Sequence, residues 1–157
     1  MNGPTSRPQL TALSKPFPSR FISPAPSGHG DYVAHDIITQ RLLLICGAYD
    51  FHVTEIVRSP DGIVEGCLAT LTVEVDGKRM SVTEAGECDN PTQKKTQGDR
   101  LKNAASDAIK RCAMRLGMAL HLWAGADKYF LHEGLSKANP NADDELAKQL
   151  TAGEEPF

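Results

Sequence analysis

The longest amphipathic pattern in the chain runs from Gly98 to Trp123. Small and apolar side chains recur there with the i, i+3, i+4, i+7 spacing of a helix that buries one stripe, at Leu101, Ala105, Ala108, Ile109, Cys112, Leu116, Leu120 and Trp123. The spacing predicts one helix of about seven turns. We expect functional side chains in the row on its opposite side, which holds Lys102, Ser106, Lys110, Arg111 and Arg115.

A shorter helical pattern covers residues 32–47. Apolar residues fill one face of it, with Arg41 as the exception, and Gly47 provides a C-terminal stop. Asp31 stands where an N-cap is expected, because its carboxylate can accept a hydrogen bond from the first turn. The pattern therefore predicts a buried helix ahead of the next segment.

Between these helices the apolar period changes to strict alternation. Residues 49–58, 63–75 and 78–85 alternate, and turn sequences separate them at 59–62 and 76–77. Three strands joined by two tight turns favour antiparallel pairing. The predicted fold class is α+β, a curved three-stranded antiparallel β-meander with the long helix packed across one face, preceded by a short helix.

The two ends differ from this central domain, which we place at residues 31–136. Residues 1–30 contain six of the ten prolines, which is typical of an extended arm with at most a short helix at 9–14. Its apolar residues should dock on the domain or on a neighbouring subunit, namely Leu10, Leu13, Phe17, Phe21 and Ile22. Residues 137–157 are acidic and polar, which predicts a flexible tail with a transient helix at 143–150.

Charge is segregated along the chain, although the net charge is only -3. Residues 78–115 hold nine Lys and Arg against five acids, a net +4, whereas residues 116–157 hold three against seven, a net -4. A cationic patch followed by an acidic tail can bind a polyanion, which a uniformly acidic protein would repel. The cations available to track phosphates are Lys94, Lys95, Arg100, Lys102, Lys110, Arg111 and Arg115. The alternative is an ordinary solvated helix face.

Other chemistry finds little support in the sequence. Cys46, Cys67, Cys88 and Cys112 form no CxxC pair, and the five histidines have no metal-ligand spacing, so we predict reduced core thiols and no metal. P-loop, dinucleotide-binding and nucleophile-elbow motifs are absent, so we predict neither an enzyme nor a cofactor. No run of eighteen apolar residues or secretory signal occurs, which favours a cytoplasmic protein without membrane contact.

Residues 104–123, AASDAIKRCAMRLGMALHLW, resemble the signature of the Rad-fifty-two and Sak-type single-strand annealing proteins of eukaryotes and phages. The matching positions are Ser106, Asp107, Ala108, Ile109, Lys110, Arg111, Leu116 and Gly117. A Phe-Pro segment at 13–22, Tyr32 ahead of the first helix and residues 82–87 resemble family members in the same order. The similarity covers roughly residues 10–131.

This resemblance implies an ATP-independent protein that binds and anneals single-stranded DNA in homologous recombination and DNA repair. Family members assemble into rings or arcs and hold the strand in a positively charged groove. Lys110 and Arg111 match their adjacent cations that grip the DNA backbone, Lys102 matches an earlier cation, and Lys94 and Lys95 match a basic loop more loosely.

The resemblance also implies partners and a location, and the sequence departs from the family at two positions. The implied partners are single-stranded DNA, further copies of the chain, and a single-stranded DNA-binding protein or an exonuclease. A phage-encoded member would act in the cytoplasm of its bacterial host. Eukaryotic members have Arg where this chain has Ile37 and Met114, and Arg115 stands next to the second of these positions.

Two other interpretations come from different classes of protein. The predicted α-β-β-β-α order and the Lys-rich start of the long helix also fit a double-stranded RNA-binding module. A purely structural oligomer would instead use the cations for salt bridges between subunits. Separately, residues 154–157, EEPF, resemble the acidic Pro-Phe tip of bacterial single-stranded DNA-binding proteins, and the alternative is a solubilising tail.

Overall fold

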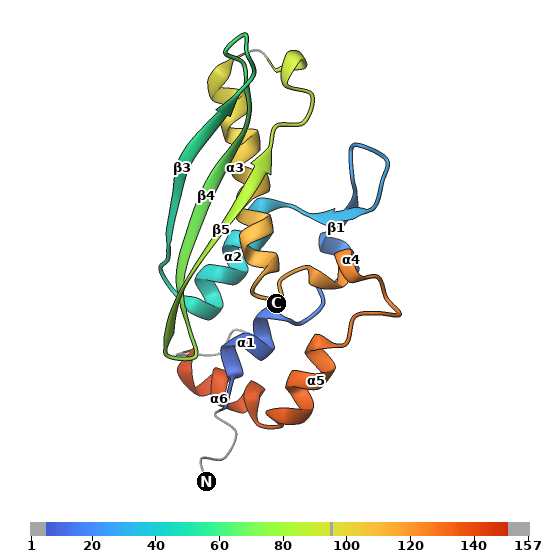
Figure 1. The fold of residues 1–157 in the computed structure, drawn as a ribbon. Helices are drawn as coiled ribbons and strands as arrows, with labels where there is room; N and C mark the ends of the chain where they lie inside the picture. The colour runs from blue at the N-terminus through green and yellow to red at the C-terminus, as the bar shows by residue number, and fades with distance from the viewer. Residues whose placement is uncertain (1–5, 95, 151–157) are drawn as a thin grey trace.

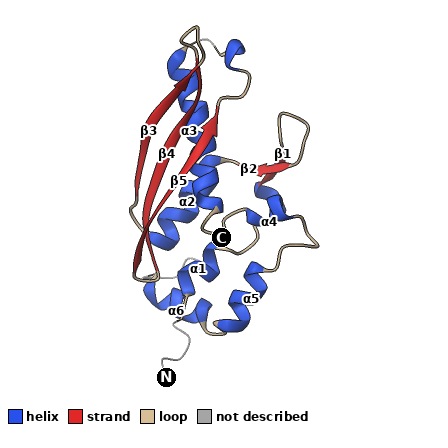
Figure 2. Cartoon of the chain, in the orientation of Figure 1, coloured by secondary structure: helices blue, strands red, loops and turns tan. Residues whose placement is uncertain are grey.

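The computed structural model describes residues 6–94 and 96–150. A long three-stranded sheet stands against helix α3 (Gln97–Met114), and shorter helices gather around the lower end of both (Figures 1 and 2). The fold is therefore α+β, with helices packed on an antiparallel sheet. The two remaining short strands pair with each other beside this body.

The sheet contains β3 (Asp50–Arg58), β4 (Val64–Val75) and β5 (Lys78–Glu87), in that order and antiparallel. All three strands were predicted, within two residues at each end. Asp76 and Gly77 both have positive φ, at 50° and 75°, which is the geometry that a two-residue hairpin turn requires. Cα pairing between β4 and β5 runs without interruption from Gly66 opposite Glu87 to Val75 opposite Lys78.

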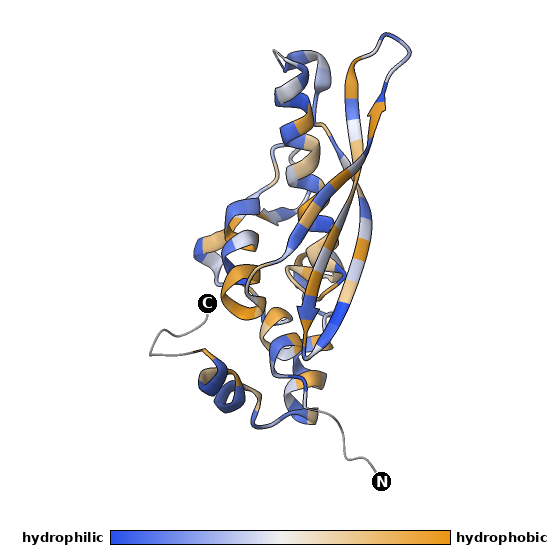
Figure 3. Ribbon diagram, turned by 90° about the vertical axis from the view of Figure 1, so that its left-hand side faces the viewer, coloured by the Kyte–Doolittle hydropathy of each residue, from blue (hydrophilic) through white to orange (hydrophobic). Residues whose placement is uncertain are grey.

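Alternation along β4 decides which face of the sheet is covered. Cys67, Ala69, Leu71, Val73 and Val75 are all buried, whereas the residues between them are half-buried or exposed. Figure 3 shows this alternation of polar and apolar positions along the strands. Helix α3 packs on the covered face through its own small residues, Ala104, Ala108 and Cys112, which are 0% exposed. Small residues on both sides bring the helix close to the sheet.

The long helix ends earlier than predicted, so the expectation of a single helix from 98 to 123 was wrong. Helix α3 stops at Met114, and the chain turns at Gly117 (φ 91°) and Ala119 (φ 55°) before α4 (Leu120–Ala124) begins. A turn there buries Leu116 and Met118, at 2% and 0% exposure. Trp123, predicted in the buried stripe, is instead 61% exposed.

The helix predicted at 32–47 is α2 (His35–Cys46), and it begins after Tyr32. Its N-cap is Ala34 without a side-chain hydrogen bond, so the prediction of Asp31 as the cap was wrong. Asp31 lies instead on β2 (Asp31–Val33), which pairs antiparallel with β1 (Ile22–Pro24). Gly47 ends the helix as predicted, with φ 76° and its N–H donating to the Leu43 carbonyl at 3.0 Å.

The N-terminal segment is docked on the domain through the apolar residues that the sequence indicated. Helix α1 (Pro8–Leu13) matches the predicted short helix; Leu13 and Phe17 are buried, and Leu10, Phe21 and Ile22 pack against the same core. The Asp76 carboxylate, in the β4–β5 turn, accepts from the N–H groups of Gln9 and Leu10 at 2.9 and 3.1 Å. A 3-10 turn, η1 (Ser19–Phe21), leads from this segment into β1.

The last described elements are α5 (Leu131–Ala138) and α6 (Ala142–Gln149). Helix α6 lies where the transient helix was predicted, packs against α1 and buries Leu146 to 2% exposure. Residues 154–157, for which a docking tip was considered, lie outside the described residues. Among the described helices, none is long and apolar enough to cross a membrane.

All four cysteines are free, as predicted. Cys67, Cys88 and Cys112 are buried, and Cys46 is half-buried. Burial raises the pKa of each thiol, and that of Cys46 reaches about 12. Because the thiolate is the reactive form, these side chains act as packing groups.

Candidate nucleic-acid interface

Helix α3 carries most of the predicted cations and presents them on different sides. The residues Lys102, Ser106 and Lys110 follow one another at intervals of four and so share a face, whereas Arg111 and Arg115 share the neighbouring one. The start of the helix is fixed by Thr96, whose hydroxyl oxygen accepts from the Asp99 N–H at 3.0 Å. Lys102 and Lys110 are separated by about 12 Å along the axis, from 1.5 Å per residue.

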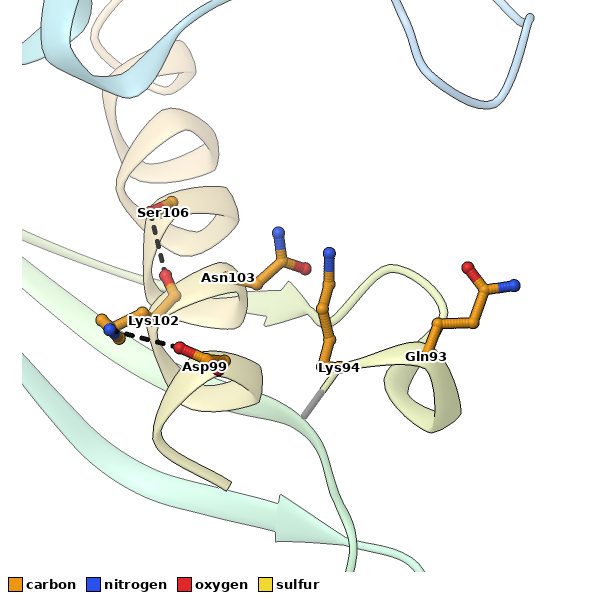
Figure 4. A pocket seen from close by; sticks show the side chains of 6 residues that line it. All are labelled: Gln93, Lys94, Asp99, Lys102, Asn103 and Ser106. Carbon is orange, nitrogen blue, oxygen red and sulfur yellow. Dashed lines mark hydrogen bonds and ion pairs between the residues drawn. The ribbon is translucent and has the colours of Figure 1, made fainter. Parts of the chain in front are cut away.

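One group of polar side chains lines an open hollow at the start of α3, here called the lysine pocket. It comprises Gln93, Lys94, Asp99, Lys102, Asn103 and Ser106 (Figure 4). The Lys102 ammonium lies 3.3 Å from the Asp99 carboxylate, toward which it is turned. Hydrogen bonds from Thr96 and Lys102 lower the pKa of Asp99. The pocket thus holds two lysines and one carboxylate, and its charge favours an anion.

Arg100, one of the cations predicted to contact DNA, holds the loop before the helix in place. Its guanidinium donates to the carbonyl oxygens of Pro91 and Lys94 at 2.6 and 2.8 Å, and to Gln97 Oε1 at 3.1 Å. This ties α3 to the short 3-10 helix η2 (Pro91–Gln93) and so positions Lys94. Lys95, a further predicted contact, lies outside the described residues.

The second group lies further along α3, in what we call the aromatic crevice. Its principal lining residues are Tyr32, Asp107, Lys110, Arg111, Leu122 and Trp123. The Lys110 ammonium lies 5.1 Å from the centre of the Tyr32 ring, and the Arg111 guanidinium lies 5.4 Å from the centre of the Trp123 ring. Both distances are within the range of cation–π attraction. Each member of the Lys-Arg pair is therefore paired with its own aromatic side chain.

Asp107 joins this crevice to the sheet. Its carboxylate accepts from Arg111 Nε and from the Glu87 N–H, both at 3.0 Å, and Glu87 is the last residue of β5. One oxygen, Oδ2, takes both bonds, which fixes the Arg111 side chain relative to the strand. The two terminal nitrogens of Arg111 donate to no partner among the described residues.

Arg115 points toward the sheet. Its Nε lies 2.5 Å from Glu84 Oε1, and the Glu84 side chain is only 20% exposed. A hollow next to this pair is lined by Glu65, Glu84 and Glu87 together with Arg111. Acids outnumber cations there, so this side of α3 is less favourable to phosphate than the aromatic crevice.

The sequence indicated seven cations, and the structure describes and separates six of them. Lys94 and Lys102 line the lysine pocket and Lys110 and Arg111 line the aromatic crevice, whereas Arg100 binds the preceding loop and Arg115, whose side chain is 62% exposed, pairs with Glu84. No cluster of three or more His, Cys, Asp or Glu suited to a metal ion occurs in the described part of the chain. The arrangement offers cations beside exposed aromatic surface, which are the two contacts that single-stranded nucleic acid uses.

Sequence reasoning missed the two aromatic residues. Tyr32 was placed at the start of a helix and Trp123 in a buried stripe, and neither was considered a binding residue. The available signal was Gly125, two residues after Trp123, because a glycine near the end of a helical pattern favours termination of the helix. Neither a protein-family model nor a curated protein matches the sequence.

Proposed function

We propose that this protein binds single-stranded DNA and anneals complementary strands, without ATP, in homologous recombination or DNA repair. The observation that carries the proposal is the placement of Lys110 and Arg111 beside the partly exposed rings of Tyr32 and Trp123. The SDAIKR motif, with its resemblance to single-strand annealing proteins, supports the same interpretation.

The mechanism follows from electrostatics. Two DNA strands repel each other through their phosphates, and a strand whose phosphates lie on Lys110 and Arg111 loses part of that repulsion. Lys94 and Lys102 would contact the same strand further along α3. A strand held in this way cannot fold on itself, so its bases stay available to a complementary strand. Annealing then needs no bound nucleotide or metal ion.

In this proposal the sheet is a curved β-meander that forms one wall of a DNA groove, and copies of the chain assemble into a ring or arc. The outer edge of β3 has no strand partner among the described residues. That strand also exposes apolar side chains, with Val53, Ile56 and Val57 at 38%, 39% and 43% exposure. Exposed apolar edge strands favour association, which supports contact between subunits at this edge.

Annealing of labelled complementary oligonucleotides in EDTA tests the proposal. The protein should speed annealing well above the spontaneous rate, and Lys110→Ala with Arg111→Ala should abolish this while the circular dichroism spectrum stays unchanged. The logarithm of the binding constant should fall with the logarithm of salt concentration by about 0.7 per phosphate contacted, with a shallower slope for the double variant. Spontaneous-rate annealing by folded protein would exclude the function.

A double-stranded RNA-binding module is the second candidate, because the order α2-β3-β4-β5-α3 is also the order of that module. Such modules recognise the shape of A-form RNA. Against this candidate, the core also includes residues of α1 and α6, which a minimal module does not need. Tighter binding to double-stranded RNA than to single-stranded DNA of equal length would favour it, and binding to neither would favour a structural oligomer.

A further inference from the structure

Trp123 is held in an exposed position that packing within the chain does not explain. It is 61% exposed, although tryptophan is buried to a high degree on average. Its neighbour Leu122 packs against the main core, and α4 is bounded by positive-φ residues at Ala119 and Gly125. These constraints orient α4 so that Leu122 packs inward and Trp123 faces solvent.

The Trp123 indole is also held in place by the Arg111 guanidinium. Glu87 donates to Asp107, Asp107 accepts from Arg111, and the Arg111 guanidinium lies over the Trp123 ring. A chain of fixed contacts therefore runs from the end of β5 to this ring. With the guanidinium on one face of the indole, the exposed area that remains can take a flat group stacking from solvent.

We propose that Trp123 is a base-stacking platform, on which one nucleobase of a bound single strand lies while Lys110 and Arg111 hold the adjoining phosphates. This rests on the proposed function and names the contact that the bases make at the same site. The neighbouring cations select the ligand: they repel a cationic guest, and they attract a flat ring that carries a phosphate. Lys110 makes no ion pair among the described residues, so its ammonium is available for this contact.

The aromatic crevice has acidic as well as cationic lining residues, which favours a stacking contact in addition to the phosphate contacts. Asp31 and Asp107 line it together with Lys110 and Arg111, so its formal charges cancel. The two acids offset part of the phosphate attraction there, so a neutral stacking contact adds affinity that the cations alone do not supply. Tyr32, whose ring lies beside Lys110, provides a second aromatic surface in the same crevice.

Trp123 is the one tryptophan in the chain, so its fluorescence reports on this position alone. An oligonucleotide of thymidylates should quench the emission on binding, whereas an abasic oligonucleotide of the same length should bind more weakly and leave the emission unchanged. Equal quenching by both would overturn the proposal. A blue shift that depends on protein concentration, and that DNA does not alter, would assign Trp123 to an interface between copies and would also overturn it.

Binding by labelled oligonucleotides gives the second measurement. Trp123→Ala should weaken binding about 5- to 150-fold, the usual effect of removing one stacking side chain. Trp123→Phe keeps an aromatic ring and should weaken binding less. The salt slope should stay as in the wild type, because no phosphate contact is removed. Phe130→Ala is the matched control, since Phe130 is 78% exposed and does not line the crevice.

The outcomes separate the two proposals. Wild-type protein that binds no single-stranded DNA would refute the proposed function itself. Protein that binds and anneals DNA, but whose Trp123→Ala variant binds as tightly as the wild type, would refute only the stacking platform. Equal weakening by Trp123→Ala and Phe130→Ala would also refute it, because the effect would then follow from lost exposed aromatic surface in general.

Discussion

Gly86→Ala tests how the helix that carries the cations is held against the sheet. A Cβ at Gly86 would lie 2.0 Å from the Ala104 carbonyl oxygen, 2.5 Å from the Ala108 nitrogen and 2.8 Å from the Ala108 Cβ. The two nearest atoms belong to the backbone of α3, so no side-chain rotation can relieve the clash. The variant folds only if α3 moves away from β5.

The size of the effect follows from that displacement. Ordinary contact begins near 3.4 Å, so the Ala104 carbonyl must recede by about 1.4 Å, the difference between 3.4 and 2.0 Å. Ala108 and Cys112 would then lose part of their packing against β4. Inserting a methyl group into a packed core costs about 1–3 kcal/mol, and backbone contact on this scale places Gly86→Ala at about 3 kcal/mol. The melting temperature should fall by about 6–12 °C.

Thermal and urea unfolding followed by circular dichroism measure this loss. Gly134→Ala is the matched control, because it adds the same methyl group within α5, where the new Cβ meets nothing within 4 Å beyond its chain neighbours and the backbone of its own helix. That variant should gain up to about 1 kcal/mol from improved helix propensity. Unfolding of Gly86→Ala at the wild-type temperature would show that α3 does not approach β5 this closely.

Two other predictions concern the helix cap at Thr96 and the titration of His121. Thr96→Ala removes the hydroxyl that accepts from the Asp99 N–H, and should lower the free energy of unfolding in urea by about 1 kcal/mol. Thr96→Ser keeps a hydroxyl and should lower it less. Equal stability of the wild type and both variants would contradict the capping role. Burial, aided by the charge of Arg41, lowers the pKa of His121 below 6.5, so the unfolded chain binds a proton that the folded chain does not. The free energy of unfolding should therefore fall as the pH drops below 6.5, and it should fall less steeply in His121→Gln. The same pH dependence in the wild type and in His121→Gln would refute this.

The strands were predictable because one face of the sheet is buried. Alternation at residues 63–75 reflects the packing of every second residue of β4 against α3, and a slip of one residue would expose the whole set. The turn at residues 76–77 needed no tertiary information, because Asp-Gly favours the positive φ values found there. In this part of the chain, local turn preference and the pattern of burial both predict the same strands and the same turn.

The end of the long helix could not be predicted from spacing alone. Leu116 and Leu120 continue the helical count, so the pattern hid the turn at Gly117. A Cβ at Gly117 would lie 3.0 Å from Leu131 and 3.3 Å from Ser14, and both contacts involve segments distant in sequence. Trp123 was misplaced for the same reason, since its exposure depends on where α4 begins.

Part of the candidate site was visible in the sequence and part was not. The Lys-Arg pair at 110–111 stood out by its motif, but helical spacing did not show that Arg115 would meet Glu84 or that Arg100 would hold the loop before the helix. Arg115 meets a residue 31 positions away in β5, whereas Arg100 binds residues three, six and nine positions earlier in the chain. Helical spacing gives the face on which a cation lies, and the neighbouring elements decide whether it is free.

The N-terminal segment links the core to the aromatic crevice. Ser23 of β1 is paired with Tyr32 of β2, so this strand pair fixes the backbone that carries the Tyr32 ring. The segment is in turn held by Arg41, which is 0% exposed, donates to the Lys15 carbonyl at 2.6 Å and lies 3.4 Å from the centre of the Phe17 ring. Loss of these contacts would weaken the interactions of a buried guanidinium and loosen the segment that leads to the strand beside Tyr32. The proline-rich part of the chain, which has the least regular pattern, therefore contributes to both the stability of the domain and the geometry of its candidate site.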